Sequence, residues 1–357
     1  HLCQGKCTRV NYDDPLQIRE VKRFISVQDE VRLKPAADNG LRAAVIGAGP
    51  SGLSFAYYLR MAGFRVDVFE ARSKAGGMVQ YAIPGFRLTD EAVANDIRRI
   101  TDLGVTINYN SHVDTAKFVS LKKDYSYIFI GSGAQLSFPL NIEGADAEGV
   151  LDPLEFLFRV RQGEATGIGK RVVIIGGGNT AMDAARTAYR LTGKDGTVTV
   201  VYRRTVNEMP ADQGEIKAVI EEGIEIIELT SPEKILQNEG RVTGLLCSRM
   251  ELKGFDKAGR PAPVKIEGSA FEIPCDTIIP AIGQLTDIGF ATPEELAVGH
   301  VPYETRLDNV YIGGDAMRGA STAINAIGDG RKAAEQIFRD AGIDCTLEKP
   351  YQNKYFS

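Results

Sequence analysis

The feature that most constrains the fold is a strand–glycine–helix pattern that occurs twice in the chain. The first copy joins the apolar run 43–46 to a helix over 51–61 through GAGPSG, and the second joins 172–175 to a helix ending near 191 through GGGNTA. Another strand follows each helix, at 65–69 and 197–202, and the first glycines of the copies are 129 residues apart. Short continuous apolar runs are typical of buried parallel strands, so the sequence predicts two parallel βαβ units.

The composition excludes several other classes of protein. The 357 residues are 43% hydrophobic and 25% charged, as in ordinary globular domains, and at ~150 residues per domain we expect two or three of them. No apolar run approaches the ~18 residues of a membrane span. The formal net charge of −5 disfavours nucleic-acid binding. With five cysteines and no signal peptide, we expect a reduced, cytoplasmic protein.

The first glycine turn has the chemistry of a dinucleotide site. Gly47, Gly49 and Gly52 match the spacing G-x-G-x-x-G, which lets a pyrophosphate approach main chain at the positive end of a helix. Glu70 follows 23 residues after Gly47, at a strand end, where a carboxylate can accept hydrogen bonds from both ribose hydroxyls. This arrangement predicts a site for FAD.

The second glycine turn differs at the corresponding strand end. Gly176 and Gly178 match the motif, and Ala181 takes the place of the third glycine. Arg203 and Arg204 follow its second strand, where the first copy has a carboxylate. Guanidinium groups bind a 2′-phosphate by charge-assisted, forked hydrogen bonds, so this unit is predicted to prefer NADPH over NADH.

A third segment also points to a flavin. A short strand leads into Gly313-Gly-Asp315, whose carboxylate can hold a ribityl hydroxyl. The helix that begins near Ser321-Thr322-Ala323 would direct its positive end at the pyrimidine edge of the ring.

Two dinucleotide sites in one chain imply hydride transfer from nicotinamide to flavin across roughly 3–3.5 Å. We expect no side chain to act as acid, base or nucleophile. No C-x-x-C occurs between the two glycine turns, which disfavours a disulfide mechanism. His112 and His300 lie in no motif, and Cys247, Cys275 and Cys345 are interpreted as ordinary thiols.

Together these segments resemble the small (beta) subunit of glutamate synthase and its relatives, which include the flavin domains of dihydropyrimidine dehydrogenase, NADPH:ferredoxin oxidoreductase subunits and selenate reductase-like flavoproteins. The resemblance covers nearly the whole chain. It is carried by VIGAGPSGLSFAYYLRMAGFRVDVFEA, by GGMVQYAIPGFRL at 76–88, by VVIIGGGNTAMDAARTA at 172–188 with VYRR and EMPA, and by NVYIGGDAMRGASTAINAIGDGRKAA at 309–334. Ala82 replaces the family's usual glycine, which suggests a slightly different main chain beside the ring.

The resemblance and the motifs give a set of candidate cofactor-binding residues. For FAD they are Gly47, Ala48, Gly49, Pro50, Ser51, Gly52, Glu70, Ala71, Arg72, Gly77, Met78, Arg87, Val113, Ser132, Gly133, Gly314, Asp315, Thr322 and Ala323. For NADPH they are Gly176, Gly178, Asn179, Thr180, Ala181, Arg203, Arg204 and Gly283.

The N-terminal segment HLCQGKCTR resembles the L-C-x-G-x-C-T segment of the family's helical iron–sulfur domain, which carries two [4Fe-4S] clusters. The resemblance implies that Cys3 and Cys7 are cluster ligands. A cluster needs four thiolates, and no third cysteine occurs before Cys247, so this chain is not expected to hold a complete cluster. We expect it to be part of a longer polypeptide.

These expectations combine into an α/β protein with two nested Rossmann-like domains. Residues 1–40 would be the end of the iron–sulfur domain and a linker, 41–150 with 286–345 the FAD domain, 151–285 the NADPH domain and 346–357 a tail. Electrons would pass through iron–sulfur clusters to an acceptor subunit or domain, and an oligomer is possible. The alternatives are the flavin module of a selenate reductase-like or other iron–sulfur flavoenzyme, a plain ferredoxin–NADP reductase, and a non-catalytic nucleotide-binding module.

Overall fold

The structure is a computed structural model that describes residues 2–28 and 34–343. It divides between Pro35 and Ala36 into two units, each described here by itself. The expected tail over 346–357 and the thiol of Cys345 lie outside the described residues.

In the first unit, the described residues form short helices only. These are α1 (Leu2–Gly5), the 3₁₀ turn η1 (Thr8–Asn11) and α2 (Ile18–Gln28). The apolar side chains of Val21 and Phe24 on α2 are 55% and 64% exposed. None of the residues of α2 is buried within this unit.

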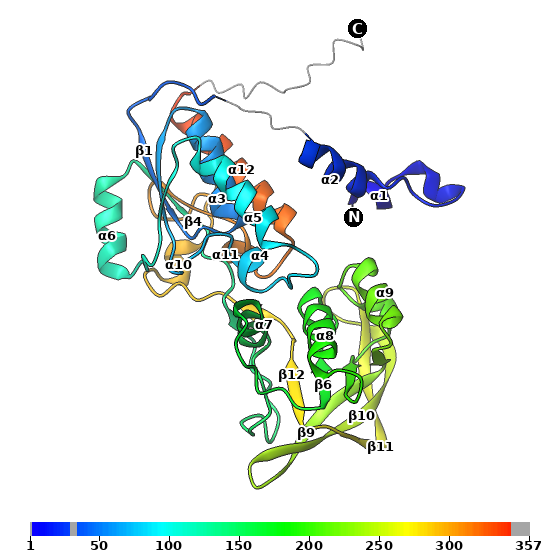
Figure 1. The fold of residues 1–357 in the computed structure, drawn as a ribbon. Helices are drawn as coiled ribbons and strands as arrows, with labels where there is room; N and C mark the ends of the chain where they lie inside the picture. The colour runs from blue at the N-terminus through cyan, green and yellow to red at the C-terminus, as the bar shows by residue number, and fades with distance from the viewer. Residues whose placement is uncertain (1, 29–33, 344–357) are drawn as a thin grey trace. The chain divides into compact units, whose positions relative to one another are not determined.

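The second unit begins with a five-stranded parallel sheet in the order β14-β4-β1-β2-β3. Its strands are β1 (Arg42–Ile46), β2 (Arg65–Phe69), β3 (Thr106–Asn108), β4 (Tyr127–Ile130) and β14 (Val310–Ile312). The helices α3 (Pro50–Met61) and α12 (Ala323–Asp340) pack against each other beside this sheet (Figure 1). Four of the five residues of β1 are buried, as its apolar run predicted.

The core of this sheet consists of aromatic and aliphatic side chains between the strands and the two helices. The ring of Phe55 on α3 stacks on Phe129 of β4, with ring centroids 4.3 Å apart. A Cβ at Gly330 of α12 would lie 2.1 Å from the carbonyl oxygen of Ser51, so this glycine lets the two helices approach closely. The first turn of α3 is thereby fixed against α12.

A second parallel sheet has the order β12-β6-β7-β8. Its strands are β6 (Arg171–Ile175), β7 (Thr197–Val201), β8 (Glu225–Ile227) and β12 (Thr277–Pro280). The helices of this part are α7 (Pro153–Gln162), α8 (Asn179–Thr192) and α9 (Gln213–Glu221). The chain returns from β12 to the first sheet, where it adds β14.

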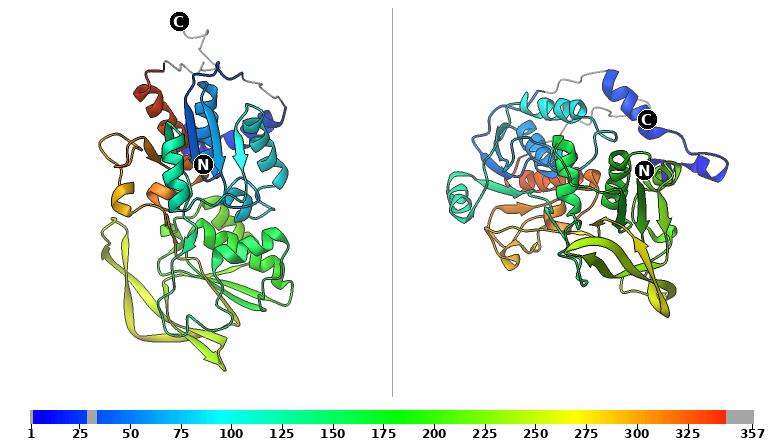
Figure 2. Two further views of the ribbon diagram at one scale, coloured as in Figure 1. Left: turned by 90° about the vertical axis from the view of Figure 1, so that its left-hand side faces the viewer. Right: turned by 60° about the horizontal axis from the view of Figure 1, so that its bottom comes forward.

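A third sheet is antiparallel and contains β9 (Thr230–Asn238), β10 (Arg241–Phe255) and β11 (Pro261–Pro274). Figure 2 shows β10 and β11 as a long two-stranded arm. The turn between β9 and β10 is formed by Glu239-Gly240, with φ of 50° and 80°. All residues of β11 are exposed or half-buried, so this strand has no buried apolar run that would mark it in the sequence.

The remaining elements connect the sheets. They are α4 (Met78–Tyr81), α5 (Asp90–Thr101), α6 (Thr115–Asp124), η2 (Val206–Glu208), α10 (Pro293–Leu296), α11 (Asp315–Arg318), and the antiparallel pair β5 (Leu136–Ser137) and β13 (Gln284–Leu285). The connection between β2 and α5 contains α4. No helix in the described part of the chain is long and apolar enough to cross a membrane.

Candidate dinucleotide-binding sites

The loop between β1 and α3 needs its three glycines for different reasons. Gly47 has a φ of +97°, and a Cβ at Gly52 would lie 2.1 Å from the carbonyl oxygen of Gly47, so the turn itself requires both. Gly49 has an ordinary φ of −78°, and the nearest atoms to a Cβ there are 3.9 Å away. The open space at Gly49 is the place where a pyrophosphate can approach the main chain.

Three buried polar atoms around this loop have no hydrogen-bond partner among the described residues. They are Ser51 Oγ in the first turn of α3, Ser132 Oγ after β4 and Asp315 Oδ1 at the start of α11. Buried polar groups are nearly always paired, so these atoms indicate a polar ligand. Pyrophosphate and ribityl oxygens fit this set, and the residues present are therefore suited to FAD.

Glu70 supports the same loop from the end of β2. Its carboxylate accepts hydrogen bonds from the backbone N–H groups of Ala48, at 2.8 Å, and Arg72, at 2.9 Å. The residue is 7% exposed. This anchoring role was not foreseen from the sequence, and the predicted contact of Glu70 with ribose hydroxyls stays a prediction.

The segment after β2 lines an open cavity of about 560 Å³ together with residues 135–137 and the helix α7. A Cβ at Gly77 would lie 3.0 Å from the Cα of Gly49, which places this segment directly against the loop. The guanidinium of Arg72 lies 4.7 Å from the centre of the Tyr81 ring. Ala82 has a φ of −116°, a conformation that any residue adopts, so the alanine requires no unusual main chain. Among the remaining candidates of this region, Met78 lines the cavity and Val113 is buried.

The loop after β14 is held by a buried carboxylate. Gly314 has a φ of +66°, and its N–H donates to Asp329 Oδ2 at 3.0 Å. Asp329, on α12, is 2% exposed and also accepts hydrogen bonds from Tyr303 and Arg318. The predicted start of α12 is confirmed, because Thr322 caps the helix and Ala323 is its first residue.

The loop between β6 and α8 resembles the β1–α3 loop, with one glycine required by the turn and one that leaves open space. Gly176 has a φ of +138°, and a Cβ there would lie 2.2 Å from the carbonyl oxygen of Ala281. No atom lies within 4 Å of a Cβ at Gly178, so this position is open like Gly49. Asn179 Oδ1 accepts from the N–H of Asp212 at 2.9 Å, and Thr180 pairs with the amide of Gln284 at 3.2 Å. The other two candidates, Ala181 and Gly283, are respectively fully buried and packed on the ring of Phe138.

The two arginines after β7 have different surroundings. Arg203 is exposed, whereas Arg204 is 2% exposed. Arg204 forms an ion pair of 2.8 Å with Asp256 and donates to the carbonyl oxygen of Pro261 at 2.7 Å. Arg204 therefore anchors the end of the β10–β11 hairpin, and Arg203 is the guanidinium available to a ligand. The phosphate-binding roles of both stay predictions.

The side chain of Arg87, predicted to contact FAD, forms ion pairs with helices that accompany the second sheet. Its guanidinium lies 2.6 Å from Asp183 of α8 and 3.0 Å from Glu215 of α9. Burial raises the pKa of Asp183 to about 6, although the charge of Arg87 opposes this shift. Asp183 and Glu215 were not among the predicted site residues, and no local sequence signal pairs them with Arg87. The expected contact of Arg87 with FAD stays a prediction.

The cysteines do not complete a metal site in the described residues. Cys3 is exposed and Cys7 is half-buried, and no described group of three or more His, Cys, Asp or Glu side chains could hold a metal ion. Two thiolates alone do not fit a [4Fe-4S] cluster. Burial raises the pKa of Cys247 and of Cys275 to about 12, so both remain protonated thiols.

The two open glycine cradles on two parallel sheets define an α/β oxidoreductase fold that binds FAD and a nicotinamide dinucleotide. The profile described as "Pyridine nucleotide-disulphide oxidoreductase" matches residues 41–330, and the chain belongs to this family. Despite the family's name, no cysteine lies between Gly47 and Gly176.

Curated relatives and solved structures agree with this assignment. The chain is 35% identical to the NADP(+)-dependent formate dehydrogenase subunit beta of Moorella thermoacetica, over 98% of this chain and 55% of the relative. It is 33% identical to the glutamate synthase (NADPH) small chain of Azospirillum brasilense, over 94% of this chain and 75% of the relative. The chain thus spans about half the length of several relatives.

Among solved structures, FprA of Mycobacterium tuberculosis in complex with NADPH has the same fold, with a TM-score of 0.75 at 18% identity over 85% of each chain. The thioredoxin reductase of T. acidophilum gives a TM-score of 0.59 at 18% identity, over 84% of this chain and 98% of that one.

Proposed function

We propose that this chain takes a hydride from NADPH onto FAD and passes the electrons to an acceptor in another subunit or domain. The observation that carries the proposal is the opposite charge at the two corresponding strand ends. Buried Glu70 follows β2, and exposed Arg203 follows β7. A carboxylate suits ribose hydroxyls and repels a 2′-phosphate, while a guanidinium attracts one.

The flavin, when bound, supplies the redox chemistry, since it accepts a hydride and can release electrons singly. The work of this chain's residues is binding and orientation. Glu70 holds the glycine loop through Ala48, and Asp329 holds the loop at Gly314. The first turn of α12 adds a positive field at the flavin end of the site. This division explains why none of the candidates has to move a proton.

The acceptor is proposed from the relatives. Two of them are named as subunits, of a formate dehydrogenase in M. thermoacetica and of an NADPH-Fe(3+) oxidoreductase in Geobacter sulfurreducens. A role as the electron-input part of a larger assembly agrees with these names. The substrate of the assembly is determined by residues other than those that form the two dinucleotide sites.

The coenzyme preference gives a direct test of the function. In an anaerobic titration followed by flavin absorbance, we expect NADPH to bleach the flavin at a much lower concentration than NADH. Replacing Arg203→Ala should weaken NADPH binding by about 1.5–3 kcal/mol, the contribution of one charged hydrogen bond, and leave NADH nearly unchanged.

NADH serves as the internal control, because it has the same rings without the 2′-phosphate. Equal losses with both coenzymes would contradict the role of Arg203 in phosphate binding. A bound flavin that neither coenzyme bleaches would contradict the proposed reaction and favour a non-catalytic nucleotide-binding module.

A further inference from the structure

A short connection from the flavin side of the second unit is fastened to helices of the nicotinamide side. Residues 83–88, with the sequence IPGFRL, join α4 to α5 and are called the strap below. The segment between β2 and α4, which includes Gly77 and leads into Met78, is called the flavin loop. The strap follows Gly77 and Met78 by a few residues. Its partners lie on α7, α8 and α9, which accompany the second sheet.

The main attachment is Arg87 with two carboxylates. Asp183 and Glu215 come from different helices, and their side chains are only 7% and 16% exposed, while that of Arg87 is 24% exposed. A guanidinium held by two carboxylates at 2.6 and 3.0 Å has a fixed position and orientation. Removal of Arg87 would leave both carboxylates without this partner.

Phe86 provides a second attachment beside the first. Its ring centre lies 4.9 Å from the guanidinium carbon of Arg186 and 3.9 Å from that of Arg190, both on α8. These arginines are themselves held by Glu222, at 2.7 and 2.8 Å. The aromatic ring therefore rests on a rigid, charged surface of the helix.

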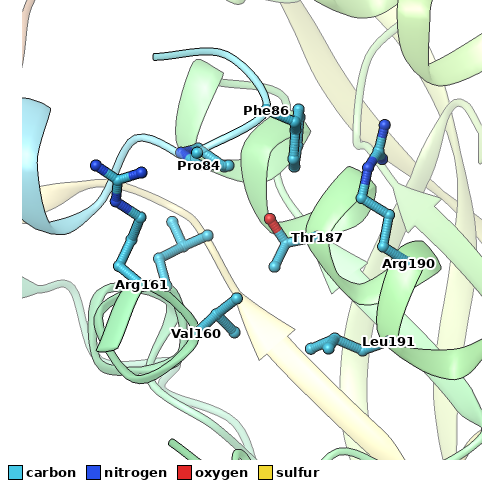
Figure 3. Close-up of a pocket in the computed structure, with 9 residues that line it drawn as sticks. Pro84, Phe86, Val160, Arg161, Thr187, Arg190 and Leu191 are labelled. Carbon is cyan, nitrogen blue, oxygen red and sulfur yellow. The ribbon is translucent and has the colours of Figure 1, made fainter. Parts of the chain in front are cut away.

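The strap is not held by close packing on all sides. A cavity of about 260 Å³ lies beneath it, between Pro84 and Phe86 of the strap, Val160 of α7, and Thr187 and Leu191 of α8 (Figure 3). This cavity is open to solvent, so the strap has no packed neighbour on that side. The ion pairs and ring contacts, rather than a filled core, thus decide where the strap lies.

The helix that holds the strap is also the helix that begins at the second glycine cradle. The first residue of α8 is Asn179, directly after Gly178, and Asp183 lies about one turn further along. One rigid helix therefore connects the pyrophosphate cradle of the nicotinamide side with the strap next to the flavin loop. A displacement of the strap would change the separation of the two bound rings.

We propose that Arg87, Asp183 and Glu215 are positioning residues for hydride transfer, which fix the flavin loop against α8 and α9. This inference rests on the proposed function. The reacting atoms must lie roughly 3–3.5 Å apart, and a misplacement of about 1 Å can lower the rate about 100-fold. Loosening the strap should therefore slow the hydride step without removing either cofactor.

The test compares Arg87→Met and Arg87→Lys with the wild-type protein in anaerobic stopped-flow reduction by NADPH. We expect Arg87→Met to lower the limiting rate of flavin bleaching ~10–100-fold. Because the guanidinium of Arg87 is held by Asp183 and Glu215, flavin content should be unchanged, and the NADPH concentration for half-maximal rate should change less than ~3-fold. Loss of flavin from Arg87→Met would overturn the positioning role and support the predicted contact of Arg87 with FAD. Arg87→Lys keeps the charge and should restore part of the rate. Arg241→Met, which removes an exposed pair with Glu148, is the matched control and should behave as wild type.

A readout without bound cofactors tests the attachment itself. In hydrogen exchange of the flavin-free protein, the amides of the strap should exchange ~10-fold faster in Arg87→Met, while those of α3 stay protected. Unchanged exchange, or a wild-type limiting rate in Arg87→Met, would overturn the positioning role. A wild-type flavin that NADPH does not bleach would overturn the proposed function as well, so the two failures are distinguishable.

Discussion

Asp183 is a carboxyl group buried on α8, and its environment works against ionisation. Its folded pKa is about 6, with desolvation as the largest cause and Arg87 as the main opposing one. Because the folded pKa lies above the unfolded value of 3.8, the folded state holds the proton more tightly. The stability that Asp183 contributes is therefore greatest at about pH 4 and is lost as pH rises through about 6.

Asp183→Asn should remove this pH dependence. Between about pH 4 and pH 7 the free energy of unfolding of the wild-type protein should fall relative to the variant, by up to about 3 kcal/mol. Urea unfolding of both proteins at several pH values measures the difference. Glu222, whose pKa the Arg190 and Arg186 guanidiniums lower to about 2, is present in both proteins, so its contribution cancels in the difference between them. A constant difference between the two proteins would contradict the raised pKa of Asp183.

Among the elements, α12 carries out two tasks for the flavin site. Its N-terminus, capped by Thr322, is predicted to face the flavin, and Asp329 in its interior fixes the loop that contains Gly314. The carboxylate of Asp329 also accepts hydrogen bonds from Arg318 and Tyr303. A single buried group thereby orders the helix and the loop of Asp315 together.

Asp329→Asn should loosen this loop, because an amide cannot accept all three hydrogen bonds and leaves Arg318 without its ion pair. We expect unfolding free energy to fall by about 2–3 kcal/mol and flavin to dissociate more readily. Denaturant unfolding and flavin fluorescence in the filtrate measure the two effects. Glu335→Gln, in an exposed pair with Arg331 on the same helix, should cost less than about 0.5 kcal/mol. Equal effects of the two variants would contradict the role of Asp329.

At the scale of the whole molecule, the candidate flavin and NADPH residues all belong to the second unit. This unit begins with two backbone hydrogen bonds. The N–H of Ala36 donates to the carbonyl oxygen of Met61, and the N–H of Asn39 to that of Gly63, both at 3.0 Å. The cysteines of the iron–sulfur-like segment, Cys3 and Cys7, belong to the other unit.

A chain that begins at residue 34 should therefore bind flavin and be bleached by NADPH as the longer chain is. The reason is that the cut preserves every described hydrogen bond of the two dinucleotide sites. Flavin content per protein and the anaerobic titration curve provide the measurement. Loss of flavin from the shortened chain would show that the first unit stabilises the site.

The sequence by itself determined the features that depend on neighbouring residues. Buried apolar runs indicated the parallel strands, and glycines that need positive φ, such as Gly47 and Gly176, marked the turns into helices. The spacing of these signals is local, since each strand, turn and helix lies within about 25 residues. For this reason the two-sheet α/β class, the glycine cradles and the start of α12 could be predicted without the structure.

Only the tertiary structure decided which charges meet. Arg204 is paired with Asp256, 52 residues away, and Arg87 with Asp183, 96 residues away. Each arginine looks equally available to a phosphate in the sequence. In the structure, Arg204 is engaged by a carboxylate from another element, and Arg87 links two parts of the fold. An ion pair depends on distance in space and leaves no periodic signal along the chain, so the sequence could not indicate either pairing.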